Sequence, residues 1–492
     1  MKSILANTRL GGLGKGVEMG VIGRLTKGLA GAAAVLLFIG VAAALFGSFA
    51  GAAGAAGSQY VASTQHITSG TGGGDCGNIG TWNSSTDTCT LGGNLAFASG
   101  AGIEIDSNSV TLNGGGYTMT GAGDNAADGV YLPGISGATV EKVTIDAFNN
   151  GVNLTGGQMN TVQQVATSGN GNTGISLTNA NNNMVMSNNS NADGVGINLA
   201  SSAYNTIMMN MVMGATMGDG ISLQDSPNNS FTSNSSDMNA GNGYCIDPGN
   251  DNNSFTGNEA SGNANNGFWL NQSDGNTIVG NTSTNNNMSG MSSSMGSMAG
   301  QGEISLQDSS NNQIYHNNFT SSSTPQASVT GTSTGNVFNL PAPVGGNYWS
   351  SWTSPDSDND GFVDSPYVFM GGQDNLPLTA PVGSGKPSLG LGAPTSFWAS
   401  LSDFDSSLLS VTWTVSNTGT AEAWSVQLTG SSNTNGVTLA STLPAAVGSG
   451  DILPGASGTA TLKYSVPAGV TAWVSALSGS AEDGVGATYT YP

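Results

Sequence analysis

Apolar and polar residues alternate in a short motif that recurs along the middle of the chain. The motif is a glycine, an apolar residue, any residue and a second aliphatic residue. It begins at Gly129, Gly151, Gly174, Gly196, Gly220, Gly243 and Gly267, and again at Glu303, where glutamate replaces glycine. Successive motifs are 22–24 residues apart, except that the last interval contains an extra 12-residue insertion. Because strand side chains alternate between two faces, both apolar residues of each motif are predicted to point inward.

A second apolar position and two columns of asparagine follow each motif. The predicted inward residues of this second strand are Val162, Val185, Ile207, Phe231, Phe255, Ile278, Ile314 and Phe338. The second asparagine column comprises Asn188, Asn210, Asn234, Asn258, Asn281 and Asn317. Asparagine tolerates left-handed turns and can form hydrogen-bonded ladders between stacked repeats. One repeat cannot bury its apolar face alone, so the pattern predicts a right-handed parallel β-helix of about ten coils.

The two ends of the chain differ from the repeats. Residues 28–50 are uncharged and follow a basic segment, which predicts one hydrophobic helix, long enough to span a bilayer, with a cytoplasmic N-terminus. Three fates stay open: signal cleavage near residues 50–57, a retained anchor, or pilin-like processing at Lys27-Gly28-Leu29. In each case residues after about 58 are expected outside the cytoplasm, either at the cell surface or secreted.

Past a Pro/Gly-rich linker at 381–394, alternation with period two returns in runs separated by turn residues. These runs predict a C-terminal β-sandwich. The expected organisation is all-β. It comprises a basic segment and helix at 1–57, a β-helix at 58–340 with its N-terminal cap at about 58–100, a C-terminal cap at 341–386, and a sandwich at 387–492.

Charge narrows the range of functions. The chain has 8 Lys+Arg against 30 Asp+Glu, a net charge of −22, and residues 143–385 contain no Lys or Arg. A nucleic-acid partner is therefore excluded, because binding to phosphates requires a basic surface.

The repeats, together with 102–123 and 346–378, resemble NosD-like right-handed parallel β-helix proteins of the pectin-lyase-like fold. The C-terminal region resembles Ig-like (CARDB-like) domains of cell-surface proteins. The NosD resemblance covers roughly 65–380 and implies copper delivery for one branch of the family. It specifies the fold and leaves the activity open.

Enzymes of this fold need a basic residue or clustered acids, and the predicted solenoid is poor in both. It contains one lysine, Lys142, and two histidines, His66 and His316. Asp225 and Asp247 are expected on neighbouring coils, where paired carboxylates could hydrolyse a glycoside, but solvated turn acids are favoured. Trp269 is expected on the outer face, where it could stack on a sugar or cover the insertion.

Metal ligands form two groups. Asp356, Asp358, Asp360, the Phe362 carbonyl and Asp364 have the spacing of a calcium loop without its final glutamate, which favours a structural Ca²⁺ over a simple acidic turn. The insertion contains Met288, Met291, Met295 and Met298, whose thioethers suit Cu⁺, although an unstructured loop is the alternative. Cys76 and Cys89 are predicted to form a disulfide outside the cytosol.

Three functions follow from these features. The first is a non-catalytic exported protein with a structural, adhesive, glycan-binding or partner-binding role, attached to the membrane if its helix is retained. The second is copper binding through the Met-rich loop. The third is a polysaccharide lyase, hydrolase or epimerase.

Overall fold

The computed structural model describes residues 58–491, apart from 99–101, 124–126, 288–301, 322–324, 343, 359, 383–388, 393, 418–422, 449, 453–455 and 483–487. The predicted helix at 28–50 and the insertion methionines Met288, Met291, Met295 and Met298 lie outside the described residues. Among the residues described, no helix has the length and apolar character needed to cross a membrane.

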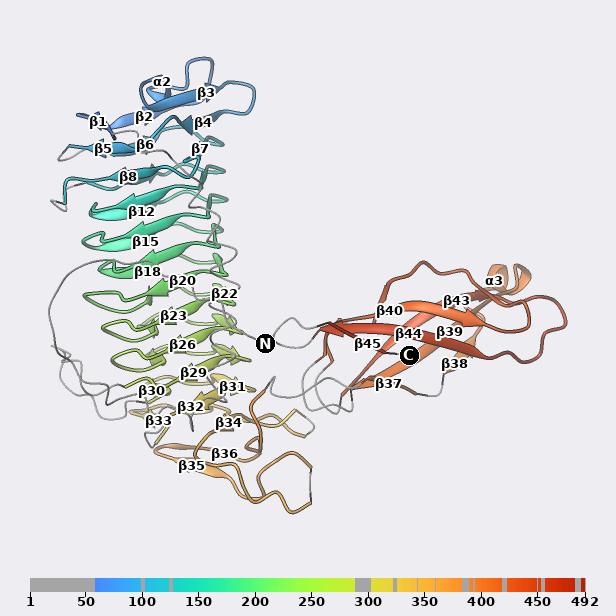
Figure 1. Cartoon of the computed structure of the whole chain (residues 1–492). Helices are drawn as coiled ribbons and strands as arrows, with labels where there is room; N and C mark the ends of the chain where they lie inside the picture. The colour runs from blue at the N-terminus through green and yellow to red at the C-terminus, as the bar shows by residue number, and fades with distance from the viewer. Residues whose placement is uncertain are drawn as a thin grey trace, which may run out of the picture. The chain divides into compact units, whose positions relative to one another are not determined.

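The middle of the chain is a solenoid of stacked coils, and its strands form three long sheets (Figure 1). This confirms the predicted all-β fold with a β-helix of about ten coils. Each regular coil contributes one strand to each sheet, and neighbouring coils pair in parallel. The exception is the antiparallel pair β3–β4 near the N-terminal end.

Sheet A has twelve strands. In spatial order they are β1 (Gln59–Val61), β5 (Leu95–Phe97), β8 (Thr118–Thr120), β11 (Thr144–Asp146), β14 (Ala166–Ser168), β17 (Asn189–Asn191), β20 (Met211–Met213), β23 (Ser235–Asp237), β26 (Glu259–Ser261), β29 (Thr282–Thr284), β32 (Asn318–Thr320) and β34 (Tyr348–Trp349).

Sheet B contains the strands of the recurring glycine motif. Its order is β2 (Gln65–Ile67), β6 (Ile103–Ile105), β9 (Val130–Pro133), β12 (Asn150–Thr155), β15 (Thr173–Thr178), β18 (Val195–Ala200), β21 (Ile221–Gln224), β24 (Tyr244–Ile246), β27 (Phe268–Asn271), β30 (Ile304–Gln307) and β33 (Ala327–Thr330).

Sheet C contains the second predicted strand of each coil. Its order is β3 (Gly80–Asn83), β4 (Thr88–Leu91), β7 (Thr111–Asn113), β10 (Thr139–Glu141), β13 (Thr161–Gln163), β16 (Met184–Met186), β19 (Thr206–Met208), β22 (Ser230–Thr232), β25 (Ser254–Thr256), β28 (Thr277–Val279) and β31 (Gln313–Tyr315).

The solenoid core is the continuous apolar interior that the repeat predicts. Ile175, Ile197 and Ile221 stack in register on sheet B, and each is fully buried. Aromatic residues stack in the same way on sheet C, where the rings of Phe231 and Phe255 lie 4.7 Å apart. Each such side chain contributes about 1.5–3 kcal/mol on full burial.

Sheet A is formed by a third strand of each coil, which the apolar pattern did not predict. Its inward positions are small or polar in several coils, namely Thr167, Ser190, Ser236 and Ser283, and all four are buried. A period-two search for apolar residues therefore passes over these strands.

The asparagine columns form the predicted ladders. In the second column, the Asn210 backbone N–H and Nδ2 donate to Asn234 Oδ1 at 3.0 and 2.9 Å, and Asn234 repeats the arrangement with Asn258. Each Nδ2 also donates to a backbone carbonyl of the preceding coil, as Asn234 does to Ile207 O at 2.8 Å. The ladder thus satisfies buried polar groups at the turns between sheets C and A from Asn188 to Asn317.

Both ends of the solenoid are covered. At the N-terminal end, the helix α2 (Cys76–Ile79) is joined to β4 by the Cys76–Cys89 disulfide. At the other end is the hairpin of β35 (Tyr367–Phe369) and β36 (Gly372–Asp374). There Trp349 is fully buried between Phe319 and Tyr367, with both ring centroids 4.6 Å away.

The C-terminal region contains two antiparallel sheets. One comprises β37 (Leu389–Leu391), β38 (Thr395–Phe397), β39 (Leu408–Asn417), β41 (Thr438–Leu439) and β43 (Ser457–Ser465), and the other β40 (Trp424–Asn433), β42 (Ala445–Ala446), β44 (Ser475–Glu482) and β45 (Thr488–Tyr491). A short helix, α3 (Leu401–Asp405), precedes β39. A separate apolar cluster that includes Trp413, Leu428 and Tyr464 is compatible with the predicted sandwich.

Candidate functional site

On sheet B, the residue between the two inward positions of each motif faces outward, and these residues form the outward column. Cys245 pairs with Trp269, which pairs with Ser305 on the next coil. The expectation of an exposed Trp269 is wrong, because this side chain is only 8% exposed, and Cys245 is 5% exposed. With so little of its surface exposed, Trp269 does not offer a free ring face for a sugar.

Asp225 and Asp247 lie on adjacent coils, as predicted, but in different environments. Asp225 is an exposed turn residue with a φ of 48°, and its N–H donates to Pro248 O. Asp247 is partly buried, and both Asp247 and Asp219 interact with the Cys245 thiol. Burial raises the pKa of the Cys245 thiol, and the charges of Asp219 and Asp247 raise it further. This environment keeps the thiol protonated and unreactive.

Asp219 belongs to a polar ladder rather than to an open acid pair. Its Oδ1 accepts from Asn242 N at 2.6 Å and Asn242 Nδ2 at 2.8 Å. Asn242 Oδ1 in turn accepts from Asn266 on the next coil at 3.0 Å. The structure thus assigns Asp219 to coil stacking.

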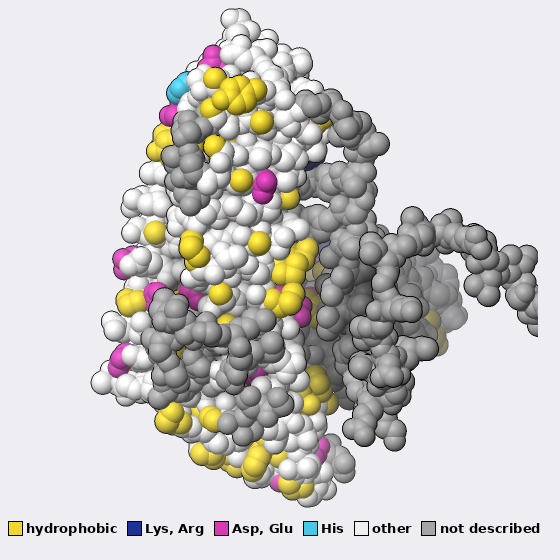
Figure 2. Space-filling view, turned by 60° about the vertical axis from the view of Figure 1, so that its left-hand side comes forward, with side chains coloured by type: hydrophobic (Ala, Val, Ile, Leu, Met, Phe, Trp, Pro, Cys, Tyr) yellow, Lys and Arg dark blue, Asp and Glu magenta, His cyan; other side chains and the backbone are white. Residues whose placement is uncertain are grey.

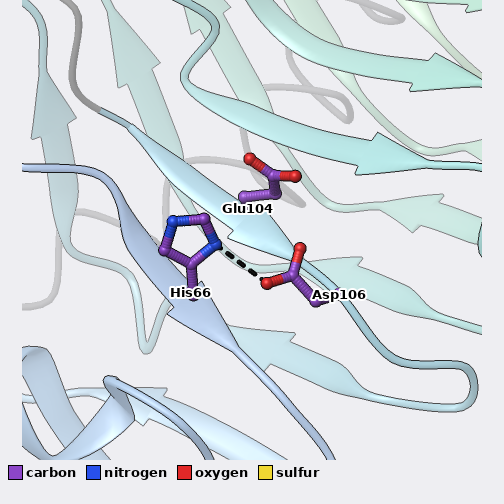
Figure 3. A group of neighbouring side chains, drawn as sticks. All are labelled: His66, Glu104 and Asp106. Atoms are coloured by element: carbon purple, nitrogen blue, oxygen red, sulfur yellow. Dashed lines mark hydrogen bonds and ion pairs between the residues drawn. The ribbon is translucent and has the colours of Figure 1, made fainter.

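A cluster at the N-terminal end of sheet B unites His66 with two acids (Figure 3). His66 on β2 pairs in register with Glu104 on β6, and Asp106 follows β6 directly. His66 Nδ1 lies 2.8 Å from Asp106 Oδ2, and one ligand atom from each of the three residues lies within 4.8 Å of the others. The hydrogen bond to Asp106 raises the pKa of His66. Burial, followed by the Asp106 charge, raises the pKa of Glu104.

No sequence motif predicted this cluster. His66 and Glu104 are separated by the N-terminal cap, so their spacing differs from the repeat of 22–24 residues. Only the pairing of β2 with β6 brings them together.

Methionines gather where sheet C turns into sheet A. Met186 on β16 pairs in register with Met208 on β19, and Met209 and Met211 follow round the turn into β20. These four residues, the methionine corner, lie at outward or turn positions and are exposed or half-buried. Apart from Met184, next to the corner on β16, corresponding outward positions of neighbouring coils in sheet C hold Thr161, Gln163, Ser230 and Thr232.

The predicted calcium loop is only partly assembled. Carboxylate oxygens of Asp356, Asp358 and Asp364 lie within 4.8 Å of one another. Asp360 is not in this group, and its Oδ1 accepts from Phe362 N at 2.9 Å, which turns it toward the loop backbone. Hydrogen bonds from Ser357 lower the pKa of Asp364 and hold it ionised. Three of the four predicted carboxylate ligands therefore lie together.

Two further acids lie on the outward side of sheet A. Asp237 on β23 and Glu259 on β26 belong to adjacent coils. Burial raises the pKa of Glu259 to about 7, and the charge of Asp237 adds to the shift. Glu259 therefore titrates near neutral pH.

Basic groups are scarce on the described surface, which is mostly uncharged and polar in Figure 2. The two lysines described are both paired, Lys142 with Glu141 at 3.1 Å and Lys463 with Asp403 at 2.9 Å. Among the described residues, no lysine or arginine is therefore free to bind an anionic ligand.

Two protein families match parts of the chain. "Right handed beta helix region" matches residues 128–283, and "Periplasmic copper-binding protein (NosD)" matches residues 215–354. A search of curated protein sequences gives no match.

Several solved structures are similar at low identity. The A-module of the mannuronan C-5 epimerase AlgE4 from Azotobacter vinelandii is 15% identical with a TM-score of 0.37, covering 58% of this chain and 90% of that one. The enzymatically active domain of tailspike protein 2 from bacteriophage CBA120 is 11% identical with a TM-score of 0.45, covering 82% and 72%. An alginate lyase from Paenibacillus sp. is 12% identical with a TM-score of 0.27, covering 59% and 97%.

Proposed function

We propose that this chain, a NosD-like right-handed β-helix protein, works outside the cytoplasm as a non-catalytic scaffold that binds copper(I) through methionine thioethers. The methionine corner is the observation that carries the proposal. Met186, Met208, Met209 and Met211 lie on two adjacent coils, and none is needed to fill the core. Soft thioether ligands favour Cu⁺ over divalent ions that prefer nitrogen or oxygen.

The position of these methionines argues for a ligand rather than for packing. Their backbones are fixed by parallel pairing and by the Asn188–Asn210 rung, in which Asn188 N–H and Nδ2 donate to Asn210 Oδ1. Neighbouring coils are about 4.8 Å apart, so thioethers on adjacent coils can converge on one ion. A rigid scaffold of this kind holds soft ligands together without ordering a loop.

Two sets of methionines must be separated by experiment. The NosD match at 215–354 includes Met288, Met291, Met295 and Met298 but begins past the corner. Cu⁺ affinity of the full chain is therefore measured by competition with a chromophoric Cu⁺ chelator under reducing conditions. Met186→Leu/Met208→Leu/Met211→Leu is expected to abolish the site, whereas the four insertion Met→Leu changes leave it intact.

Met370→Leu serves as the matched control, because Met370 is an exposed methionine of the C-terminal cap. Equal affinity of the corner variant and this control would reject the corner as the site. Loss of Cu⁺ only in the insertion variant would move the site to the insertion and retain the copper function. No stoichiometric Cu⁺ in any variant would reject the copper function.

The charge distribution supports a non-catalytic role. The His66 cluster combines one imidazole with two carboxylates, and Asp75 Oδ2 accepts from His66 N at 3.0 Å. This negative environment repels a uronate polymer, and no described lysine is free to bind its carboxylates. The protein is expected to leave alginate and pectate unchanged in product analysis.

A second candidate is the binding of neutral glycans on sheet B. Asn153 Nδ2 and Asn150 Nδ2 each donate to Asp128 at 2.7 Å, which fixes a row of amides beside the polar outward column. Fixed amides and hydroxyls can bind sugar hydroxyls. A neutral-glycan array probed with wild type and Asn153→Ala tests this role, and equal or absent signals would reject it.

Calcium binding by the loop is a further structural proposal. Asp356, Asp358 and Asp364 supply hard oxygens, which Ca²⁺ prefers. Added Ca²⁺ is expected to raise the Tm of the full chain, and Asp358→Asn is expected to remove the increase. An equal increase in both proteins would reject this site.

A further inference from the structure

The geometry points to a further metal site, distinct from the thioether and calcium sites, in which His66, Glu104 and Asp106 bind one divalent ion of the Zn²⁺ type. Their ligand atoms already lie within 4.8 Å of one another without an ion. An imidazole with two carboxylates and one position left for water is a ligand set that suits Zn²⁺.

The backbone fixes this arrangement. Residues 65–67 of β2 pair with residues 103–105 of β6, so His66 and Glu104 are direct neighbours on the outer face. Ile67 and Ile105, the next residues along the two strands, are fully buried and anchor both strands in the core. Asp106 N–H donates to Ile67 O at 2.9 Å, which holds the third ligand at the strand end. Ligands on paired strands are better preorganised than ligands on a loop.

The charges of the cluster favour a cation. Even with His66 protonated, Glu104 and Asp106 leave one negative charge, and Asp75 adds another beside the His66 backbone. Among the residues described, both lysines have other partners. A divalent ion would neutralise this excess, and the proton that His66 shares with Asp106 would pass to solvent on binding.

The cluster is accessible to an ion from solution. The His66 side chain is 50% exposed and that of Asp106 is 31% exposed. Figure 3 shows the imidazole facing Asp106, with Glu104 on the neighbouring strand. An ion from solution can therefore reach the side chains of His66 and Asp106.

The test uses Zn²⁺ with the full chain in excess Ca²⁺, so that the acidic loop at 356–364 is occupied. Isothermal titration calorimetry is expected to show one Zn²⁺ bound per chain. The Kd for Zn²⁺ is expected to rise at least tenfold in His66→Gln and in Asp106→Asn. Asp225→Asn is the control, because Asp225 is an exposed solenoid acid outside the cluster and asparagine tolerates its positive φ. Circular dichroism establishes that each variant is folded.

Nuclear magnetic resonance gives an independent readout, because the chain has only two histidines. Zn²⁺ is expected to shift the ring nitrogen signals of His66 and to leave those of the buried His316 unchanged. Unchanged His66 signals, or equal Zn²⁺ affinity in wild type and the two cluster variants, would overturn the inference. Neither result bears on Cu⁺ binding, which involves other residues and another ion.

Discussion

The asparagine ladder makes a sharp prediction at Asn234, whose side chain is 1% exposed. Substitution Asn234→Ala removes the acceptor of Asn210 N and Asn210 Nδ2, and the donor to Ile207 O. Asn210 N and Ile207 O each lose a hydrogen bond, at about 1–3 kcal/mol for each buried group, whereas Asn210 Nδ2 keeps its bond to Val185 O. A water molecule in the vacated space can recover part of this, so the expected loss is about 2–4 kcal/mol.

Hydrogen exchange measured by mass spectrometry is the suitable assay, because a repeat structure need not unfold in one step. Peptides that cover β19 to β26 should exchange faster in Asn234→Ala, while those of the C-terminal sheets should not change. Asn191→Ala is the control, because Asn191 is an exposed asparagine at the end of β17 in sheet A. Asn191→Ala should change the free energy of local unfolding, as measured by hydrogen exchange, by less than about 0.5 kcal/mol. Equal effects of the two substitutions would refute the ladder's role in stability.

Three other perturbations have defined outcomes. Because burial raises the pKa of Glu259 to about 7, its ionisation destabilises the fold as pH rises from about 4.5 to 7. Glu259→Gln should reduce the change in the free energy of unfolding over this pH range by about 1–3 kcal/mol, measured by urea titrations at several pH values. An equal pH dependence of this free energy in wild type and Glu259→Gln would contradict the assignment. Phe255→Ala should lower the Tm through a loss of about 3–5 kcal/mol, unlike Val279→Ala at an outward position of the next coil, and equal losses would contradict the stacked core. Cys76→Ser/Cys89→Ser should destabilise the N-terminal cap by about 3 kcal/mol in exchange measurements, and unchanged protection of β2 to β4 would contradict this.

The repeat made the solenoid predictable because each coil presents the same apolar positions. Ile197 and Leu199, for example, lie two residues apart on β18 and therefore share one face of the strand. That face is buried in the core. Sheet A was missed because residues such as Ser190 and Ser236 fill its inner positions, and their burial depends on the ladder next to them. Because these inward residues are polar, a search for periodic apolar residues does not detect their strands.

The candidate sites were less predictable, for reasons of tertiary structure. Trp269 was placed on the correct face, but its exposure depends on surroundings that the sequence does not specify. Asp360 matched the spacing of a calcium ligand, yet its carboxylate bonds to the backbone of its own loop. His66 and Glu104 form a cluster through strand pairing across the cap, which no local motif encodes.

X-ray absorption at the copper edge of the Cu⁺-loaded full chain tests the central claim most directly. The account predicts a first shell dominated by sulfur. It also predicts that Met186→Leu/Met208→Leu/Met211→Leu, but not Met370→Leu, removes the sulfur signal and the bound copper. A first shell of nitrogen and oxygen only, or sulfur ligation that survives in the corner variant, would contradict the account.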